Sequence, residues 1–298
     1  MSMIDVSIII VNYNGANYLP ECLDSVLSSQ GNFSKEIIVI DNHSQDDSLT
    51  VLAPYQNQIL LIKNTVNQGF AFANNQGLAK AKGTYTFLLN NDAVLYPDSL
   101  NIMLNFFKSH PETGLLAPKL LNADGSLQCP GSVIGHFLFK TDEPRKLKFV
   151  SGAALLIKTH VFKDIGGFDE NFFFYNEDID LCKQILKKGL DIYYVPAAQV
   201  KHYGGQATAS RKPNSIIEGY RGGLYLAYKH YPAIIFHVYR VILLIDLLPR
   251  IIWYTGKSLF DNDAAPLRNA YLKILKIDFT SAIFLTRSSA DKRNIIYD

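Results

Sequence analysis

The sequence has little cysteine and almost no net charge, and each shortage excludes a class of protein. Cys22, Cys129 and Cys182 are its three cysteines, widely spaced and without a CxxC pair. An odd number at such spacing predicts neither a disulfide framework nor a zinc cluster, and it fits a reducing cytosol. The net charge of +2 argues against nucleic acid as the main partner, because domains that bind nucleic acid usually carry a marked basic excess.

Neither a targeting pattern nor a long uninterrupted apolar run is evident. The start, MSMIDVSIIIVNYNG, has no basic residues before its short apolar stretch, so we expect a first buried strand rather than a signal peptide. Charged residues and a proline interrupt the most apolar segment, Ala233 to Tyr254, which is unfavourable for a membrane span. Arg240, Asp246 and Arg250 fall within about a third of the helical circumference, which predicts an amphipathic surface helix.

Strand patterns alternate with helical patterns through the first two hundred residues. The continuous apolar stretch Val6 to Val11 predicts a parallel strand that is buried on both faces. Further strands are expected at residues 36–40, 59–63, 84–89 and 192–195, a buried segment at 149–158, and helices at 18–28, 49–55, 69–82 and 179–188. This alternation predicts an open, doubly wound α/β sheet, in which ligands bind beyond the carboxyl ends of the strands.

Two segments depart from this alternation. Residues 122–147 are rich in Gly, Pro and polar residues, and we expect a surface loop or flap there. We expect the strand at 192–195 to end at Pro196. After about residue 215 long helical segments rich in Tyr, Leu and Ile follow, so we expect a first domain over 1–215 and a helical extension over 216–298.

Three groups of residues have the chemistry of a catalytic site. Asp92 follows a predicted strand, where a carboxylate can bind a divalent cation that bridges two phosphates; the alternative is a capping Asp in the turn before Pro97. Glu177 and Asp178 follow an aromatic run, which suggests a general base of raised proton affinity, although helix starts favour acidic residues in any case. His202 is either a metal ligand or a packed histidine.

Six blocks, taken in order, resemble the family-2 glycosyltransferases over about residues 4 to 210, and particularly the bacterial rhamnosyltransferase-like members. They are VSIIIVNYNG (6–15), EIIVIDNHSQDDS (36–48), NQGFAFANNQG (67–77), LLNNDAVL (88–95), SGAALLIKTHVFKDIGGFDENFFFYNEDIDLCKQILKKG (151–189) and VPAAQVKHYGG (195–205). The resemblance implies a GT-A fold, which is a Rossmann-like, doubly wound mixed sheet, with a C-terminal α-helical extension. Residues 1–215 would then bind the nucleotide sugar and catalyse transfer.

The resemblance also implies binding roles for the loops after the first two strands. Tyr13 would pack near the base and Asp41 would hydrogen-bond it, while the segment from Asn67 would close over the ribose and diphosphate. Arg211, with its neighbour Lys212, suggests a lid over the diphosphate by charge and position. The residues expected to bind the nucleotide sugar are Tyr13, Asn14, Asp41, Asn42, Ser44, Asn67, Gly69, Phe70, Asn74, Asn90, Asn91 and Arg211.

For the reaction, the resemblance implies a metal-dependent, inverting transfer. The family's Asp-X-Asp motif has Asn90 at its first position here, so the metal, Mg²⁺ or Mn²⁺, would fall to Asp92 with His202 as a further ligand. Asp178 would deprotonate the acceptor hydroxyl, and Glu177 would hold or orient the acceptor. The metal would stabilise the diphosphate that leaves.

The expected donor is a dTDP- or UDP-linked sugar, with dTDP-rhamnose first, and the expected acceptor is a saccharide or a lipid-linked saccharide of bacterial cell-surface polysaccharide synthesis. The two alternatives are a sugar nucleotidyltransferase and a GT-A domain that binds a nucleotide sugar without turnover. The first should show a basic, Gly-rich loop after the first strand, and VNYNGANYLPE has no basic residue. The C-terminal helices suggest either peripheral contact with the inner face of the cytoplasmic membrane or a homodimer.

Overall fold

The structure is a computed structural model that describes residues 4–129, 137–204 and 212–278. It divides into two compact units, one of residues 1–168 and 178–207 and the other of residues 169–177 and 208–298. We refer to them as the α/β unit and the helical unit. The short segment 169–177 therefore belongs with the C-terminal helices, although it lies between two parts of the α/β unit in the sequence.

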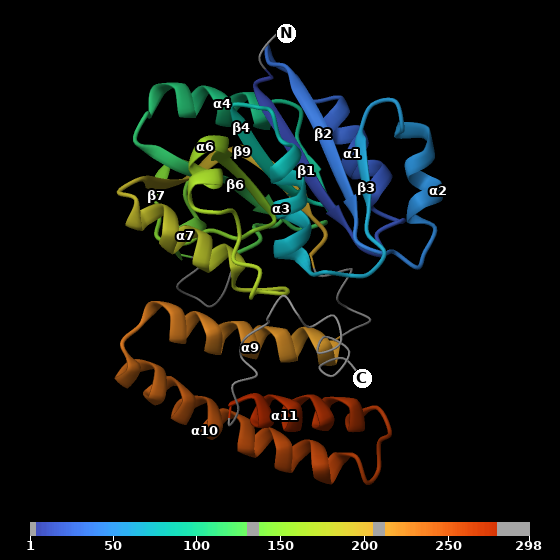
Figure 1. The fold of residues 1–298 in the computed structure, drawn as a ribbon, viewed down its shortest axis with the longest axis vertical. Helices are drawn as coiled ribbons and strands as arrows, with labels where there is room; N and C mark the ends of the chain where they lie inside the picture. Colours follow the sequence, from blue (N-terminus) through green and yellow to red (C-terminus); the bar gives the residue numbers. More distant parts are fainter. Residues whose placement is uncertain (1–3, 130–136, 205–211, 279–298) are drawn as a thin grey trace. The chain divides into compact units, whose positions relative to one another are not determined.

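One mixed sheet forms the centre of the α/β unit (Figure 1). Its described strands are β1 (Val6–Asn12), β2 (Lys35–Asp41), β3 (Leu60–Lys63), β4 (Tyr85–Asn90), β5 (Ala93–Leu95), β6 (Thr113–Leu121), β7 (Arg145–Lys146), β8 (Ala154–Lys158) and β9 (Asp191–His202). The order is β3-β2-β1-β4-β8-β6-β9-β5, with β7 beside β9. The strands β3, β2, β1 and β4 are parallel, β8 is antiparallel to β4 and β6, and β6 and β9 are parallel.

Helices cover both faces of the sheet, as Figure 1 shows. They are α1 (Leu19–Leu27), α2 (Ser48–Leu52), α3 (Phe70–Lys80), α4 (Ser99–Ser109), α6 (Thr159–Asp164) and α7 (Glu177–Lys187), with a 3₁₀ turn at Ala53–Tyr55. Along β1, Ile8 and Ile10 pack in a core with α1 and α4, whereas Ile9 packs in a second core with α3 and α7. The run of apolar residues in β1 is explained by this burial on both faces, and the predicted doubly wound fold is confirmed.

From β1 the chain continues to β2 and β3 on one side of β1, and it then crosses to β4 on the other side. This is the topological switch point of the sheet, where open α/β sheets bind ligands beyond the carboxyl ends of their strands. Asn12, Asp41 and Asn90 are the last residues of β1, β2 and β4. The fold therefore brings the predicted polar segments to one edge.

One local prediction was wrong, and a second, the surface loop at 122–147, holds for most of its described residues but not for all of them. The strand expected to end at Pro196 continues to His202, because β9 pairs with β6 up to Val195 and again from Gln199. Pro196 lies in the register shift between these stretches, where it does not have to donate a hydrogen bond to the neighbouring strand. In the segment expected to be a surface loop, β7 pairs with β9 and Phe139 is buried in a core. Its residues 130–136 lie outside the described part of the chain.

The helical unit contains α9 (Lys212–His230), α10 (Ala233–Lys257) and α11 (Ala264–Asp278). Its core includes Leu224, Leu243 and Ile274, one from each helix. In α10, Arg240 pairs with Asp278 of α11 at 2.8 Å, so polar groups of this helix lie toward its neighbours. Among the described residues, we find no helix that combines the length and the hydropathy required to cross a bilayer.

Candidate active site

A fully buried asparagine connects the loops at the switch point. Asn12 donates from Nδ2 to Asp41 Oδ1 and to Ser44 Oγ, both at 3.0 Å, and its Oδ1 accepts from Asn91 Nδ2 at 2.8 Å. These bonds join the ends of β1, β2 and β4. The sequence analysis did not select Asn12 as a site residue; the available signal was an amide at the end of an apolar strand, where every buried polar group needs a partner.

The loop after β1 leaves no room for a side chain at Gly15. A Cβ atom there would lie 2.0 Å from Asn91 Nδ2 and 2.4 Å from Asn12 Oδ1, so a larger residue would break the Asn12 bonds. Asn14 has a left-handed backbone (φ 52°), and its Oδ1 accepts from Gln45 N at 2.7 Å. The loops after β1 and β2 therefore interlock.

The third predicted segment is attached to the second through Asn42. Asn42 Nδ2 donates to Asn67 Oδ1 at 2.9 Å and to Gly69 O at 3.2 Å. Gly69 has a φ of 89°, a conformation that favours glycine, and it turns the chain into α3, which begins at Phe70. The fold brings the three loops together, and the contact of their residues with a nucleotide remains a prediction.

Within this arrangement the predicted binding residues differ in exposure. Asp41, Asn42, Asn74 and Asn91 are buried, and Asn74 Nδ2 donates to Phe70 O at 3.0 Å. Gly69 is also buried, and the half-buried residues are Tyr13, Asn14, Ser44, Asn67, Phe70 and Asn90. Arg211 lies outside the described residues.

Asp92 and His202 form the second part of the site. The antiparallel pairing of β5 with β9 sets Ala93 opposite His202, and Asp92 Oδ1 lies 3.2 Å from His202 Nε2. Both side chains are largely buried, with 7% of Asp92 and 12% of His202 exposed. Asn90 Nδ2 lies 3.3 Å from the same Nε2, and the buried Asn90 Oδ1 has no hydrogen-bond partner. Three predicted side chains from two distant blocks of the sequence thus meet here.

Gln128 determines which nitrogen of the His202 imidazole carries the proton in the neutral form. Its Nε2 donates to Asn122 Oδ1 at 2.9 Å and to His202 O at 3.2 Å, so its Oε1 is the atom that faces His202 Nδ1 at 2.6 Å. Nδ1 must then carry the proton that it donates to Oε1, and a neutral His202 has its lone pair on Nε2. The sequence analysis missed Gln128, because its contact with His202 depends on the tertiary fold.

When His202 is neutral, this tautomer sets two acceptors opposite one another. The lone pair on Nε2 and the carboxylate oxygen of Asp92 are then 3.2 Å apart, an arrangement that a cation between them would stabilise. Carboxylate oxygen, amide oxygen and imidazole nitrogen are ligands that Mg²⁺ and Mn²⁺ accept. The described residues contain no group of three His, Cys, Asp or Glu side chains suited to a metal. The residues nevertheless fit a divalent cation if the free Oδ1 of Asn90 supplies the third ligand.

Asp178 is a half-buried carboxylate near the start of α7. Gly152 N donates to Oδ2 at 2.9 Å and Ile179 N donates to Oδ1 at 2.8 Å. Burial raises the pKa of Asp178 to about 6, although both backbone bonds lower the pKa. A carboxylate with this pKa is mostly ionised at neutral pH and binds a proton more strongly than an ordinary Asp does.

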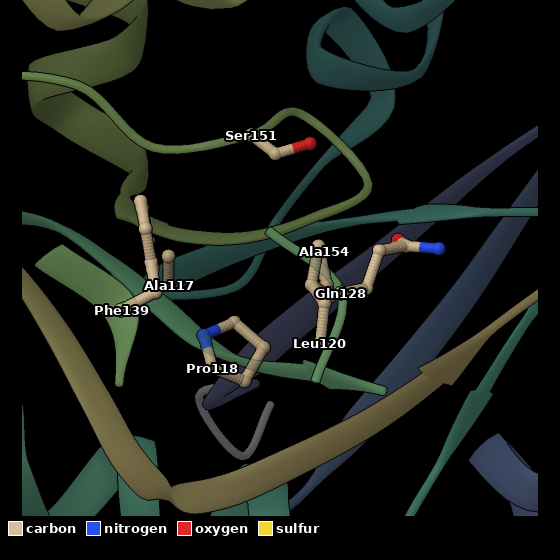
Figure 2. Close-up of a pocket in the computed structure, with 7 residues that line it drawn as sticks. All are labelled: Ala117, Pro118, Leu120, Gln128, Phe139, Ser151 and Ala154. Carbon is tan, nitrogen blue, oxygen red and sulfur yellow. The ribbon is translucent and has the colours of Figure 1, made fainter. Parts of the chain in front are cut away.

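Backbone contacts connect Asp178 to the Asp92 and His202 pair. Asn90 N donates to Ala153 O at 2.9 Å. Gly152, which precedes Ala153, donates its backbone N–H to Asp178. A small hollow lies beside this connection, with Gln128 and Ser151 among its lining residues (Figure 2). Its other lining residues are Ala117, Pro118, Leu120, Phe139 and Ala154. Glu177, the first residue of α7, is buried and belongs to the helical unit.

Comparison with known proteins decides the family. The family model described as glycosyl transferase family 2 matches residues 7–166, more than half of the chain. The chain belongs to this family. A second model, described as the N-terminal domain of galactosyltransferase, matches residues 136–205, a range that contains Asp178 and His202.

Individual relatives agree with the family. An N-acetylglucosaminyl-diphospho-decaprenol L-rhamnosyltransferase of Mycobacterium tuberculosis is 26% identical over 74% of this chain and 82% of its own length. An uncharacterized glycosyltransferase of Rickettsia typhi is 33% identical over 61% of this chain and 58% of its own. The predicted family-2 glycosyltransferase of a rhamnosyltransferase-like branch is confirmed.

Solved structures confirm the fold. A mannosyltransferase of Pyrobaculum calidifontis, solved with GDP-Man and Mn²⁺, is 17% identical with a TM-score of 0.61 over 91% of this chain and 86% of that one. TarS of S. aureus, solved with UDP-GlcNAc, is 20% identical with a TM-score of 0.58 over 73% and 65%. These neighbours have the GT-A fold that the sequence predicted, here with C-terminal helices.

Replacing Gln128 with Leu should weaken Mn²⁺ binding in the presence of UDP or dTDP by about 10- to 100-fold, the usual effect of losing a group that orients a metal-binding histidine. Electron paramagnetic resonance of free Mn²⁺ measures the affinity. The control is Gln56→Leu, at an exposed position. Equal affinity in both variants would show that Gln128 does not control the imidazole.

Proposed function

We propose that the protein transfers a sugar from a nucleoside diphosphate to a hydroxyl of a saccharide or lipid-linked acceptor, with inversion, in cell-surface polysaccharide synthesis. The observation that supports this most is the half-buried carboxylate of Asp178, with a pKa of about 6, which backbone contacts connect to the pair of Asp92 and His202. Family membership makes the protein a glycosyltransferase. The proposal adds the stereochemical course of the transfer and the residues that carry it out.

In this proposal each part of the sheet edge has one task. The interlocked loops around Asp41 and Asn42 hold the nucleotide, and Asp92, His202 Nε2 and Asn90 Oδ1 hold Mg²⁺ or Mn²⁺. When bound, the cation neutralises negative charge on the leaving diphosphate. Asp178 accepts the proton of the acceptor hydroxyl while that oxygen attacks the anomeric carbon from the opposite side. A single displacement of this kind inverts the configuration.

The proposed donor is dTDP-rhamnose, with other dTDP- or UDP-linked sugars next. Its support is the Mycobacterium relative, whose name gives a rhamnosyl transfer and a decaprenol-linked acceptor. A Myxococcus xanthus O-antigen biosynthesis protein, 26% identical over 75% of this chain but only 19% of its own length, points to the same kind of polysaccharide. Release of nucleotide from a panel of donor sugars tests this choice.

Asp178→Asn should reduce transfer by roughly 10²- to 10⁴-fold, the usual contribution of a general base, while the affinity for the nucleotide stays unchanged. Because only the ionised carboxylate accepts a proton, the wild-type kcat/KM should fall about tenfold per pH unit below a pKa of about 6 and level off above it. The exposed Asp164→Asn is the matched control. Wild-type turnover in Asp178→Asn would refute the assignment of the base.

Asp92→Ala should abolish the increase in nucleotide affinity that Mn²⁺ produces, because one of the cation's anionic ligands is lost. Isothermal titration with UDP or dTDP, with and without Mn²⁺, measures this increase. Nucleotide binding without metal should persist. An unchanged response to Mn²⁺ would place the metal elsewhere.

We also propose that α10 attaches the protein to the surface of a membrane. Six residues recur on this helix at intervals of four and three, and they are 50–72% exposed: Ile234, Val238, Val241, Ile245, Leu248 and Ile252. Beyond them Trp253 is 69% and Phe260 92% exposed, with Lys257 between them. Aromatic and basic residues beside an apolar stripe are typical of helices that lie in a bilayer interface. A lipid-linked acceptor of the proposed kind would be found at that interface.

Wild-type protein should float with vesicles of phosphatidylglycerol and phosphatidylethanolamine, and Ile245→Asp with Ile252→Asp should bind at least tenfold more weakly, because buried apolar area drives such binding. Val66→Asp, at an exposed apolar position of the α/β unit, is the control. Wild-type protein that does not float but forms a dimer, which the double variant abolishes, would replace the membrane with a second copy.

A further inference from the structure

Helix α9 has three glycines in its interior, at positions 219, 222 and 223. Glycine is less favourable than any residue except proline inside a helix, so three in five positions require an explanation. Gly219 and Gly222 are one turn apart and therefore share a face of the helix. That face lies against residues 175 and 176 of the segment 169–177, in the same unit.

The contact between this segment and α9 is too close for any side chain at position 222. A Cβ atom on Gly222 would lie 2.7 Å from Asn176 Nδ2 and 2.9 Å from the carbonyl oxygen of Tyr175. Asn176 Nδ2 also donates to Gly219 O at 3.1 Å. The segment thus rests directly on the backbone of the helix.

The backbone of the segment is strained where it meets the helix. Tyr175 and Asn176 have φ values of 72° and 71°, and two consecutive residues other than glycine in this region are unfavourable. Such strain persists only when surrounding contacts hold it. Glu177 and Asp178 follow immediately in the chain.

A buried arginine holds the other end of the segment. Arg221, which is fully buried, binds both carboxylate oxygens of Glu218 and donates from Nη1 to Asn171 O at 2.8 Å. At the start of the segment, Asp169 accepts from Lys229 at 2.7 Å and from Tyr225 at 2.8 Å. Residues of α9 thus hold both ends of the segment and its strained turn.

We propose that α9 is a positioning element for acceptor use: its glycine face and Arg221 fix the strained conformation of residues 171–177, and with it the placement of Glu177 and the entry of the chain into Asp178. This rests on the proposed function, in which Asp178 is the base, and on the expectation from the sequence that Glu177 holds or orients the acceptor. Donor binding, which uses the loops after β1 and β2, should not depend on α9.

The test is Gly222→Ala, which improves helix propensity but forces the segment off the helix. Gly223→Ala is the matched control, because its Cβ would meet only the hydroxyl end of Tyr239 in α10. Gly222→Ala should lower kcat/KM for the acceptor by roughly 10²-fold, the effect of a displacement of about 1 Å, and leave the dissociation constant of the nucleotide sugar within twofold. Gly223→Ala should retain both values. The melting temperature confirms that each variant is folded.

A second variant tests the arginine without leaving a buried charge unpaired. Glu218→Gln with Arg221→Met removes both charges at once, so the helix should stay folded while the bond to Asn171 O is lost. Its acceptor kcat/KM should fall at least tenfold, again with unchanged donor affinity.

Equal acceptor kinetics in Gly222→Ala and Gly223→Ala, or a parallel loss of donor affinity and transfer in Gly222→Ala, would overturn the inference alone. Absence of sugar transfer by the wild-type protein on the whole panel of donors would overturn the proposed function and this inference together.

Discussion

The need to hydrogen-bond buried polar groups shapes the whole edge of the sheet. Asn12 ends a strand that is buried on both faces, so its amide can find partners only in the neighbouring loops. It finds them in Asp41, Ser44 and Asn91, which end or follow the two strands beside it. Losing one bond would leave a buried amide unsatisfied, at about 1–3 kcal/mol. The register of three loops therefore depends on one side chain.

The neighbouring corner of the sheet edge, formed by Asn90, Asp92 and His202, departs from this rule. Asn90 Oδ1 is buried without a partner, and in the neutral tautomer that Gln128 favours, the lone pair of His202 Nε2 faces the carboxylate of Asp92. Groups that repel or lack partners in the protein alone are expected where a ligand completes them. The contrast between the satisfied Asn12 network and this corner distinguishes a structural cluster from the site to which we assign a cation.

Much of the fold could be predicted from the sequence, because burial on two faces gives strands such as β1 a continuous apolar pattern. The residues to which we assign the chemistry, Asp92, Asp178 and His202, also stood out by type and position. Gln128 and Arg221 did not, since each acts through a contact with a distant part of the chain. The prediction that a strand ends at Pro196 was wrong because the proline lies in a register shift, which becomes visible only in the pairing of β6 with β9.

Helix α10 shows a limit of a different kind. Periodicity tells that a helix has a polar and an apolar face, but it does not tell which face lies inside. Here Asp246 accepts from Tyr220 of α9 and Arg240 pairs with Asp278 of α11, so polar groups lie among the helices. Partly exposed pairs of this kind add little to stability. Leu243 and Leu247 of α10 are buried in the core, but a second set of its apolar residues is exposed and adds no such stabilisation. A helix that gives up this stabilisation in water recovers it only when its apolar face is covered, which is why we assign that face to a membrane surface.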